Sequence, residues 1–260
     1  FNTDSLIIQL TMNLAMVGVY GVALKICQYM LMLTKQLVNV LTPLISELKE
    51  KREEQAIRYL LLDLSRYITA TGVMITGSIY VFHTDLLRFW VGEEFLAAGI
   101  PLLILCTAVM LSIPELTASN VLTMTGHHKF TAKVSISSII VNITVSLLLV
   151  RPLGLTGIAL GTLASSFINS TLITLGKAAR VYRFGYREYL KRVFLPVLAP
   201  LPLLLGTGAA VRHYFAVSSL WDMMGKALPG AAVYLAVFWL IGVSRESRAR
   251  ILARISRRRR

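Results

Sequence analysis

Long, mostly apolar segments separated by short polar loops restrict the fold of this chain more than any other feature. A helix that spans a bilayer needs about 20 mostly apolar residues. Segments of this kind lie at about 15–46, 59–82, 96–122, 130–150, 154–176, 193–211 and 227–243. Residues 1–12 look like the end of a further helix that is truncated at its start. No strand alternation runs through these segments, and open sheet edges do not lie in lipid. The sequence therefore predicts an all-α, polytopic membrane helix bundle.

Composition agrees with a membrane protein. Hydrophobic residues make up 55% of the chain and charged residues 15%, whereas an average soluble domain is about 25% charged. No loop is long enough to hold a soluble catalytic domain, and the phosphate-binding pattern G-x-x-x-x-G-K-[ST] does not occur. We therefore expect neither an enzyme nor a bound cofactor.

Histidine and cysteine residues give no metal-site pattern in this sequence. The segments HTD at 83–85 and HH at 127–128 lack the further ligands that a zinc site needs, so we expect no metal there. Cys27 and Cys106 both lie in apolar runs, where cysteine usually behaves as a small buried hydrophobe. The sequence predicts two buried thiols rather than a disulfide.

Basic residues are distributed unevenly between the loops. If the loop at 47–66 is cytoplasmic and the spans alternate, most of the 27 basic residues lie on the cytoplasmic side. The exceptions outside the spans are Arg88, Arg151, Arg212 and Lys226. This pattern follows the positive-inside rule and predicts a cytoplasmic C-terminus. The basic tail at 245–260 would then lie near anionic lipid, where each Lys or Arg contributes about 1 kcal/mol. We expect no nucleic-acid partner.

A stripe of polar residues follows one face of the segment at 15–46. At 100° per residue Lys25, Gln28, Gln36 and Asn39 share this face, with Lys35 at its margin. At about 1.5 Å per residue, Lys25 lies roughly 15 Å in from the outer end of its helix, near the bilayer midplane. These four residues are candidate substrate-binding residues.

Asp4 lies at a similar depth on the preceding helix, about 12 Å in from its outer end. A charge at the bilayer centre costs at least ~2.5–3.5 kcal/mol, so such residues pair with each other or face a cavity. One interpretation is a buried Asp4–Lys25 ion pair that fixes two helices. The other is that Lys25 lines a water-filled cavity and holds an anionic substrate while Asp4 restrains it, which makes Asp4 a further candidate substrate-binding residue.

Weaker polar patterns occur in three later spans. Glu115 lies in a row with Ser112 and Ser119, and it either lines the pathway, carries a proton or is structural. Polar residues form a stripe on the next helix at Thr131, Ser135, Ser138, Asn142 and Ser146. Small residues recur every four positions at Gly157, Gly161, Ser165 and Asn169, a spacing that lets two helices approach closely. Asn142 and Asn169 are further candidates for the pathway or for coupling.

Four sequence stretches follow one another in a recognisable order. The run TDSLIIQLTMNLAMVGVYGVALKI has an acid at Asp4 ahead of Ile-Ile and then Val-Gly-x-Tyr at 17–20, and the stretches VLTPLISELKEK, LLRFWVGEEF and GLTGIALGTLASSF come after it. In this order they resemble the polysaccharide-type flippases of the multidrug/oligosaccharidyl-lipid/polysaccharide exporter superfamily, in which the first run is similar to the start of a repeat. The resemblance covers nearly the whole chain.

The resemblance implies a domain organisation and a location. Such proteins have two six-helix lobes around a central cavity, and some add two C-terminal helices. Residues 1–182 would be the second lobe with its first helix truncated, 183–244 two additional helices and 245–260 a basic cytoplasmic tail. The first lobe would be missing. The implied location is the bacterial plasma (inner) membrane.

The resemblance also implies a substrate and partners. The family moves lipid-linked oligosaccharide, carried on undecaprenyl diphosphate, across the membrane by alternating access. The products would be polysaccharides such as lipopolysaccharide O-antigen or exopolysaccharide, with a polysaccharide polymerase and glycosyltransferases as partners. Lys25 would attract the diphosphate, and Gln28, Gln36 and Asn39 would bind sugar hydroxyls.

Two other functions fit the same sequence. A cation-coupled multidrug antiporter of the same superfamily would rely on Asp4 and Glu115 rather than on Lys25. A non-transporting membrane scaffold of a polysaccharide synthesis complex would instead rely on its loops at 47–59 and 177–192.

Overall fold

The architecture of the described chain is entirely helical. The structure is a computed structural model that describes residues 2–40 and 42–243. Within these residues every regular element is a helix and none is a strand, so the predicted all-α bundle is confirmed. The basic tail predicted at 245–260 lies outside the described residues.

The helices have the following bounds. In chain order they are α1 (Asn2–Thr11), α2 (Leu14–Asn39), α3 (Thr42–Glu50), α4 (Glu54–Trp90), η1 (Glu93–Ala98), α5 (Gly99–Met124), α6 (His128–Leu153), α7 (Leu155–Ser165), η2 (Ser166–Thr174), α8 (Leu175–Val181), α9 (Tyr186–Tyr189), η3 (Leu190–Phe194), α10 (Leu195–Leu198), α11 (Leu201–Tyr214) and α12 (Leu220–Gly242). Of these, η1 is a 3₁₀-helix, and η2 and η3 are π-helices.

Membrane-spanning segments overlap most of the predicted ones. Within the described residues, 6 helical segments are long and apolar enough to cross a membrane. They are Leu14–Glu50, Glu93–Met124, His128–Leu153, Leu155–Val181, Tyr186–Tyr214 and Leu220–Gly242. The protein is therefore a multi-pass membrane protein. The remaining predicted span, 59–82, lies within α4, which is 37 residues long but is less apolar than these segments.

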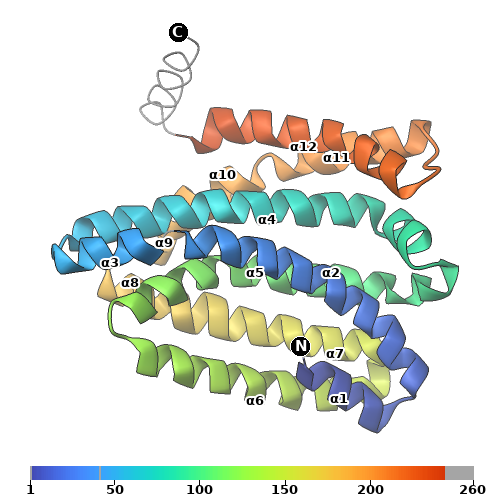
Figure 1. Ribbon diagram of the computed structural model, residues 1–260, viewed down its shortest axis with the longest axis horizontal. Helices are drawn as coiled ribbons and strands as arrows, with labels where there is room; N and C mark the ends of the chain where they lie inside the picture. The colour runs from blue at the N-terminus through green and yellow to red at the C-terminus, as the bar shows by residue number, and fades with distance from the viewer. Residues whose placement is uncertain (1, 41, 244–260) are drawn as a thin grey trace.

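The position of α4 explains its composition. In Figure 1 α4 runs through the middle of the molecule, with α11 and α12 on one side and α2 and α5 on the other, and it contacts all four. Gly72 of α4 lies against Ile113 of α5, and Gly77 lies against Leu201 and Leu204 of α11. A helix covered by protein on two sides exposes less surface to lipid, so it needs fewer apolar side chains.

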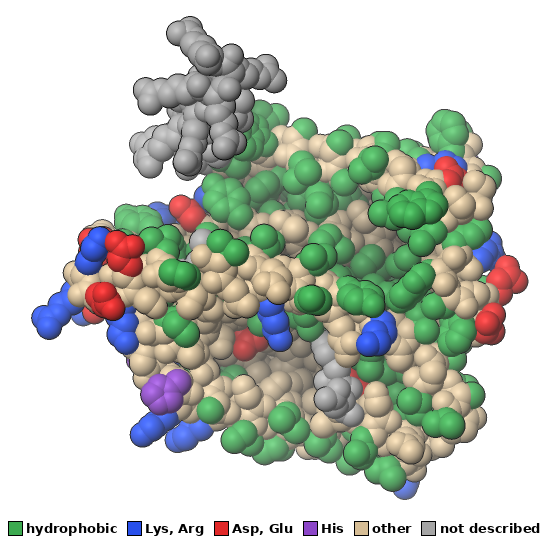
Figure 2. Space-filling model, in the orientation of Figure 1, with side chains coloured by type: hydrophobic (Ala, Val, Ile, Leu, Met, Phe, Trp, Pro, Cys, Tyr) green, Lys and Arg blue, Asp and Glu red, His purple; other side chains and the backbone are tan. Residues whose placement is uncertain are grey.

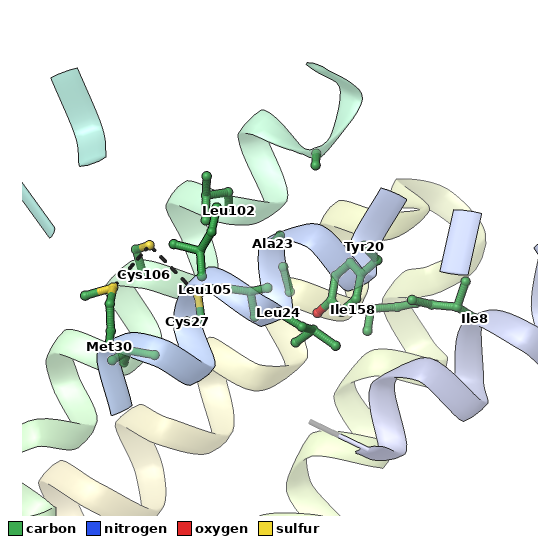
Figure 3. Packing of buried hydrophobic residues seen from close by; sticks show 14 of the residues in the cluster. Ile8, Tyr20, Ala23, Leu24, Cys27, Met30, Leu102, Leu105, Cys106 and Ile158 are labelled. Atoms are coloured by element: carbon green, nitrogen blue, oxygen red, sulfur yellow. Dashed lines mark hydrogen bonds between the residues drawn. The ribbon is translucent and has the colours of Figure 1, made fainter. Parts of the chain in front are cut away.

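A tightly packed core holds α2 against α5 and α7. Figure 3 shows Tyr20, Leu24 and Cys27 of α2 directed toward Leu105 and Cys106 of α5 and toward Ile158 of α7. The two cysteines are fully buried and form no disulfide, and their thiols share a weak hydrogen bond of 3.9 Å between the Sγ atoms. The prediction of two buried thiols is confirmed.

Close backbone packing joins α6 to α7. A Cβ atom at Gly157 would collide with the backbone carbonyl of Leu149, and one at Gly161 would collide with Ser146 Oγ and lie 2.9 Å from Ser146 N. The close approach predicted from the small-residue spacing is therefore present. Ser138 and Ser165 hydroxyls add a hydrogen bond of 2.7 Å between the two helices.

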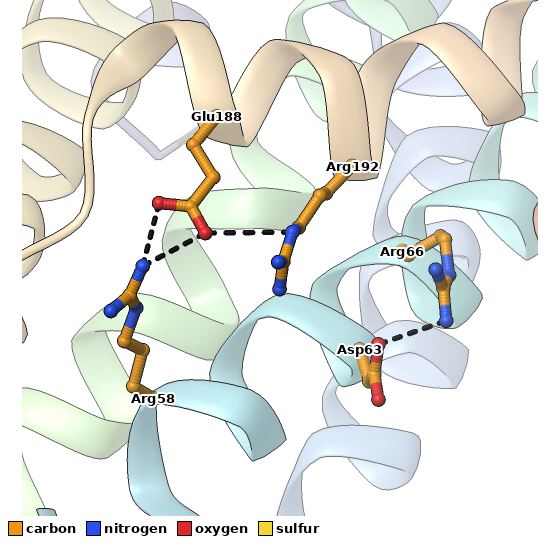
Figure 4. A network of polar contacts seen from close by, with 5 residues as sticks. All are labelled: Arg58, Asp63, Arg66, Glu188 and Arg192. Atoms are coloured by element: carbon orange, nitrogen blue, oxygen red, sulfur yellow. Dashed lines mark hydrogen bonds and ion pairs between the residues drawn. The ribbon is translucent and has the colours of Figure 1, made fainter. Parts of the chain in front are cut away.

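Ion pairs join α4 to the C-terminal helices near both of its ends. Near its start, Arg58 donates to both carboxylate oxygens of Glu188 in α9 at 2.7 and 2.8 Å, and Arg192 lies 3.4 Å from the same carboxylate (Figure 4). Near its end, Arg212 Nε of α11 lies 2.7 Å from Asp85 Oδ2. The guanidinium of Arg212 also donates to Thr84 Oγ1 at 3.1 Å.

We expect Arg212→Gln to loosen the C-terminal helices from α4. The substitution leaves Asp85, which is 8% exposed, without its cation. An uncompensated charge of this kind costs about 1–3 kcal/mol. Thermal unfolding of the purified full-length protein should show the loss, and Asp85→Asn added to Arg212→Gln should restore part of it. Equal losses in the single and double variants would contradict an energetic coupling between the two side chains.

Candidate functional site

The polar face predicted on α2 is open. Lys25, Gln36 and Asn39 are exposed and Gln28 is half-buried; these four residues are called the α2 face below. Figure 2 shows a hollow between α2 and α6, with basic side chains of α2 along its rim and acidic side chains deeper inside. The only basic residues of α2 are Lys25 and Lys35, so these two supply the positive charge of this helix.

Local sequence determines which side of α2 is open. The side chain of Asn13 caps the start of the helix by accepting a hydrogen bond from Met16 N at 3.0 Å. Tyr20, Ala23 and Cys27 then turn toward the core. Gly18 and Gly21 lie on the same face as Lys25, and a Cβ at either would meet nothing within 4 Å. The α2 face therefore borders open space along several turns.

Asp4 lies in a buried polar cluster that joins α1, α2, α6 and α7. The carboxylate is 0% exposed. Its Oδ2 accepts hydrogen bonds from Thr162 Oγ1 at 3.0 Å and from Tyr20 Oη at 3.3 Å. Asn142 Nδ2 donates to Thr162 Oγ1 at 2.9 Å, and Asn142 Oδ1 accepts from Thr3 Oγ1 at 3.2 Å. Asp4, Tyr20, Asn142 and Thr162 are called the Asp4 cluster below.

The Asp4–Lys25 ion pair considered from the sequence is wrong. Among the described ion pairs none joins these residues, and Lys25 is exposed whereas Asp4 is fully buried. Tyr20 is the residue of α2 that contacts Asp4. Because Tyr20 and Lys25 are five residues apart, they lie about 140° apart around the helix. Matched depth in the membrane was therefore not enough to bring Asp4 and Lys25 together.

Glu115 is the second acid of the site. It is half-buried on α5 and accepts a hydrogen bond from Ser170 Oγ of η2 at 3.1 Å. The predicted residue on η2, Asn169, is 2% exposed and donates to Ser165 O at 3.0 Å instead.

The π-helix η2 brings Ser170 to Glu115, and the sequence pattern did not predict it. Residues 154–176 were expected to form one regular α-helix, but its second half has the wider π-turn. In a regular α-helix the spacing by fours would have placed Asn169 on the Gly161 face. Turns of π-helix frequently occur at functional sites. In the sequence, η2 is indicated only by the polar residues Ser166, Asn169 and Ser170 within one stretch.

The buried oxygens of the Asp4 cluster have the chemistry of a charge-binding site. Asp4 Oδ1 is buried and has no hydrogen-bond partner among the described residues. The hydroxyl oxygens of Thr162 and Tyr20 lie 3.0 and 3.3 Å from Asp4 Oδ2. A buried carboxylate with hydroxyl oxygens beside it suits a proton or a small hard cation. In contrast, the α2 face carries one cation and three amides, which suit an anion with hydroxyl groups.

Comparison with known proteins gives one distant similarity. The chain is 22% identical over 172 residues to "Probable low-salt glycan biosynthesis flippase Agl15" of Haloferax volcanii. The match covers 65% of this chain and 36% of that protein, so the chain spans only about a third of its relative. No protein-family model matches the chain.

The similarity and the fold agree with each other. A bundle with several apolar spanning helices is the architecture expected of a transporter, and the distant relative is named as a flippase. Together they support a flippase-like membrane protein.

Proposed function

We propose that this chain is one lobe of a flippase that moves a lipid-linked oligosaccharide across a membrane by alternating access. The observation that carries the proposal is the open α2 face, where the exposed Lys25 shares one side of the helix with three amide side chains. A diphosphate linked to sugars presents both kinds of group that this face can bind: anionic oxygens for Lys25 and hydroxyls for Gln28, Gln36 and Asn39. The name of the distant relative supports glycan as the cargo.

The proposed location and partners follow from the same function. The membrane is the bacterial plasma membrane, the C-terminus is cytoplasmic and the partner lobe is supplied by the rest of the same protein. The basic residues at the end of α3 (Lys49, Lys51 and Arg52) and those between α8 and η3 support this orientation by the positive-inside rule. Enzymes that assemble and polymerise the glycan would act before and after the transport step, and the lobe itself performs no covalent chemistry.

The Asp4 cluster is proposed as the coupling element. A carboxylate with one unpaired oxygen binds a proton or a monovalent cation in one state of the cycle and releases it in another. Because the cluster joins α1, α2, α6 and α7, loading and unloading would change how these helices pack. The α2 face is part of α2, so the charge state of Asp4 would affect the substrate face directly.

Replacement of Lys25 tests the substrate role. We expect Lys25→Ala in the full-length protein to lower glycan export by roughly 10-fold or more, since a charge-assisted contact contributes about 1.5–3 kcal/mol. Lys25→Arg should retain most of the activity because it keeps the charge. Export is measured as polysaccharide output in a complementation assay, with membrane insertion followed by immunoblot.

Lys191→Ala is the matched control, because Lys191 is exposed but lies on η3, which packs on α4, α9 and α10. It should leave export unchanged. Normal output from Lys25→Ala would remove Lys25 from the mechanism. A proton-coupled dye efflux that persists in Lys25→Ala would favour the multidrug antiporter, and normal output from every α2-face variant would favour the scaffold.

A further inference from the structure

A cavity of about 490 Å³ lies where α8 leads into α9, and no residue of the α2 face lines it. Basic and aromatic side chains dominate its wall. Among the lining residues are Phe130 of α6, Lys177 and Arg180 of α8, and Phe184 and Tyr186 beyond α8. No acidic residue belongs to the described lining. This cavity is called the α8 pocket below.

The two cations of the α8 pocket are available to a ligand. Lys177 and Arg180 are three residues apart on α8, so they point to the same side of the helix. Neither takes part in an ion pair among the described residues. The Lys177 ammonium lies 5.7 Å from the centre of the Phe130 ring, which orients it and leaves its N–H donors unused. An anion with several oxygens can accept from both residues.

The wall of the α8 pocket also has a fixed apolar part. Tyr186 Oη donates to the Leu172 carbonyl of the π-helix η2 at 2.8 Å, which closes one side of the pocket. A Cβ at Gly176 would lie 2.6 Å from the same hydroxyl, so the absence of a side chain at this position leaves space for the Tyr186 ring. Leu172 is 49% exposed and Ile173 is 36% exposed beside it. These side chains extend the pocket into an apolar surface.

The location of the α8 pocket suits a lipid. The spanning segment Leu155–Val181 ends at the pocket and the segment Tyr186–Tyr214 begins there. The pocket therefore lies at a membrane–water interface, with cations toward water and exposed aliphatic residues on the membrane-spanning part. It lies on the side that carries most of the basic residues, and basic pockets between spanning helices on that side bind anionic headgroups.

We propose that the α8 pocket binds an anionic glycerophospholipid, such as phosphatidylglycerol, from the surrounding leaflet. The phosphodiester contacts Lys177 and Arg180, and an acyl chain lies along Leu172 and Ile173. Glycerophospholipids are the bulk component of the bilayer. The cavity of about 490 Å³ can hold a glycerol headgroup, which is smaller than a chain of sugars. This lipid is distinct from the transported substrate, so the site is independent of the proposed function.

Native mass spectrometry of the full-length protein tests the proposal. The protein is exchanged into nanodiscs of phosphatidylcholine with a graded fraction of phosphatidylglycerol, and retained lipid is counted after release. The double variant Lys177→Gln/Arg180→Gln should need roughly 30-fold more phosphatidylglycerol for the same occupancy, since each basic residue near the surface contributes a factor of about five. The matched control is Arg187→Gln/Lys191→Gln, which removes the same charge from exposed positions outside the α8 pocket.

Three results would overturn the assignment. Equal losses in the two double variants would indicate attraction by total surface charge rather than by a site. Displacement of the bound lipid by inorganic phosphate alone would indicate a phosphate site. Preferential retention of undecaprenyl phosphate over phosphatidylglycerol would make the pocket a site for the carrier lipid instead. Retention lost only in Lys177→Gln/Arg180→Gln, and unaffected by phosphate, supports the proposal.

Discussion

Asp4→Asn should leave the protein folded and stop most of its transport. The amide oxygen of asparagine can still accept the hydrogen bonds from Thr162 and Tyr20 that Asp4 Oδ2 accepts. Removing a charge from a fully buried intramembrane position should keep or raise thermal stability, because that charge costs at least ~2.5–3.5 kcal/mol. If the carboxylate binds the coupling ion, export should fall about 10- to 100-fold, the equivalent of one lost charged interaction.

Two measurements on the same protein check this result. Thermal unfolding in detergent reports stability, and glycan output in a complementation assay reports transport. Asp4→Ala is the contrasting variant, since it leaves the buried hydroxyls of Tyr20 and Thr162 without an acceptor and should lower stability as well. Wild-type export by Asp4→Asn would show that the charge of Asp4 has no part in coupling.

The double variant Gly157→Ala/Gly161→Ala should be strongly destabilised. Each added methyl group meets backbone atoms of α6, at Leu149 and Ser146, and backbone cannot move aside as a side chain can. Overpacking of this kind costs about 1–3 kcal/mol per site. For a chain of this size the sum corresponds to a fall of roughly 5–20 °C in the unfolding temperature.

The matched control is Gly18→Ala/Gly21→Ala. These glycines lie within α2, and an added Cβ would meet nothing within 4 Å. Alanine also has a higher helix propensity than glycine, by about 1 kcal/mol, so the control should be as stable as the parent protein or more so. Similar unfolding temperatures for the two double variants would contradict the close packing of α6 on α7.

Much of the helical framework was predictable because long apolar runs permit few alternatives in lipid. The burial of Cys27 and Cys106 followed from the apolar context of their helices, whereas the polar stripe left open whether Lys25 faces a cavity or pairs with Asp4. The approach of α6 to α7 followed from Gly157 and Gly161, whose spacing is specific to a shared face.

The contacts of the acidic residues were not predictable in the same way. Thr162, a partner of Asp4, is 158 residues away, and nothing in the spacing of either residue specifies which helices meet. Ser170 reaches Glu115 only through a π-helix, whose extra residue per turn shifts every later position around the axis. Contacts between distant helices depend on how far each helix is rotated about its own axis relative to its neighbours. A single sequence does not specify that rotation.

The ion pairs at the two ends of α4 bear on the number of times the chain crosses the membrane. Arg58 near its start lies beside α9, and Asp85 near its end lies beside the end of α11. A helix of 37 residues is about 55 Å long, more than the thickness of the hydrocarbon core. If α4 is left out of the count, every loop after it changes sides, and the basic residues around α3 and α9 fall on opposite faces. Counting α4 returns them to one face, so the least apolar long helix determines the orientation of all the helices that follow.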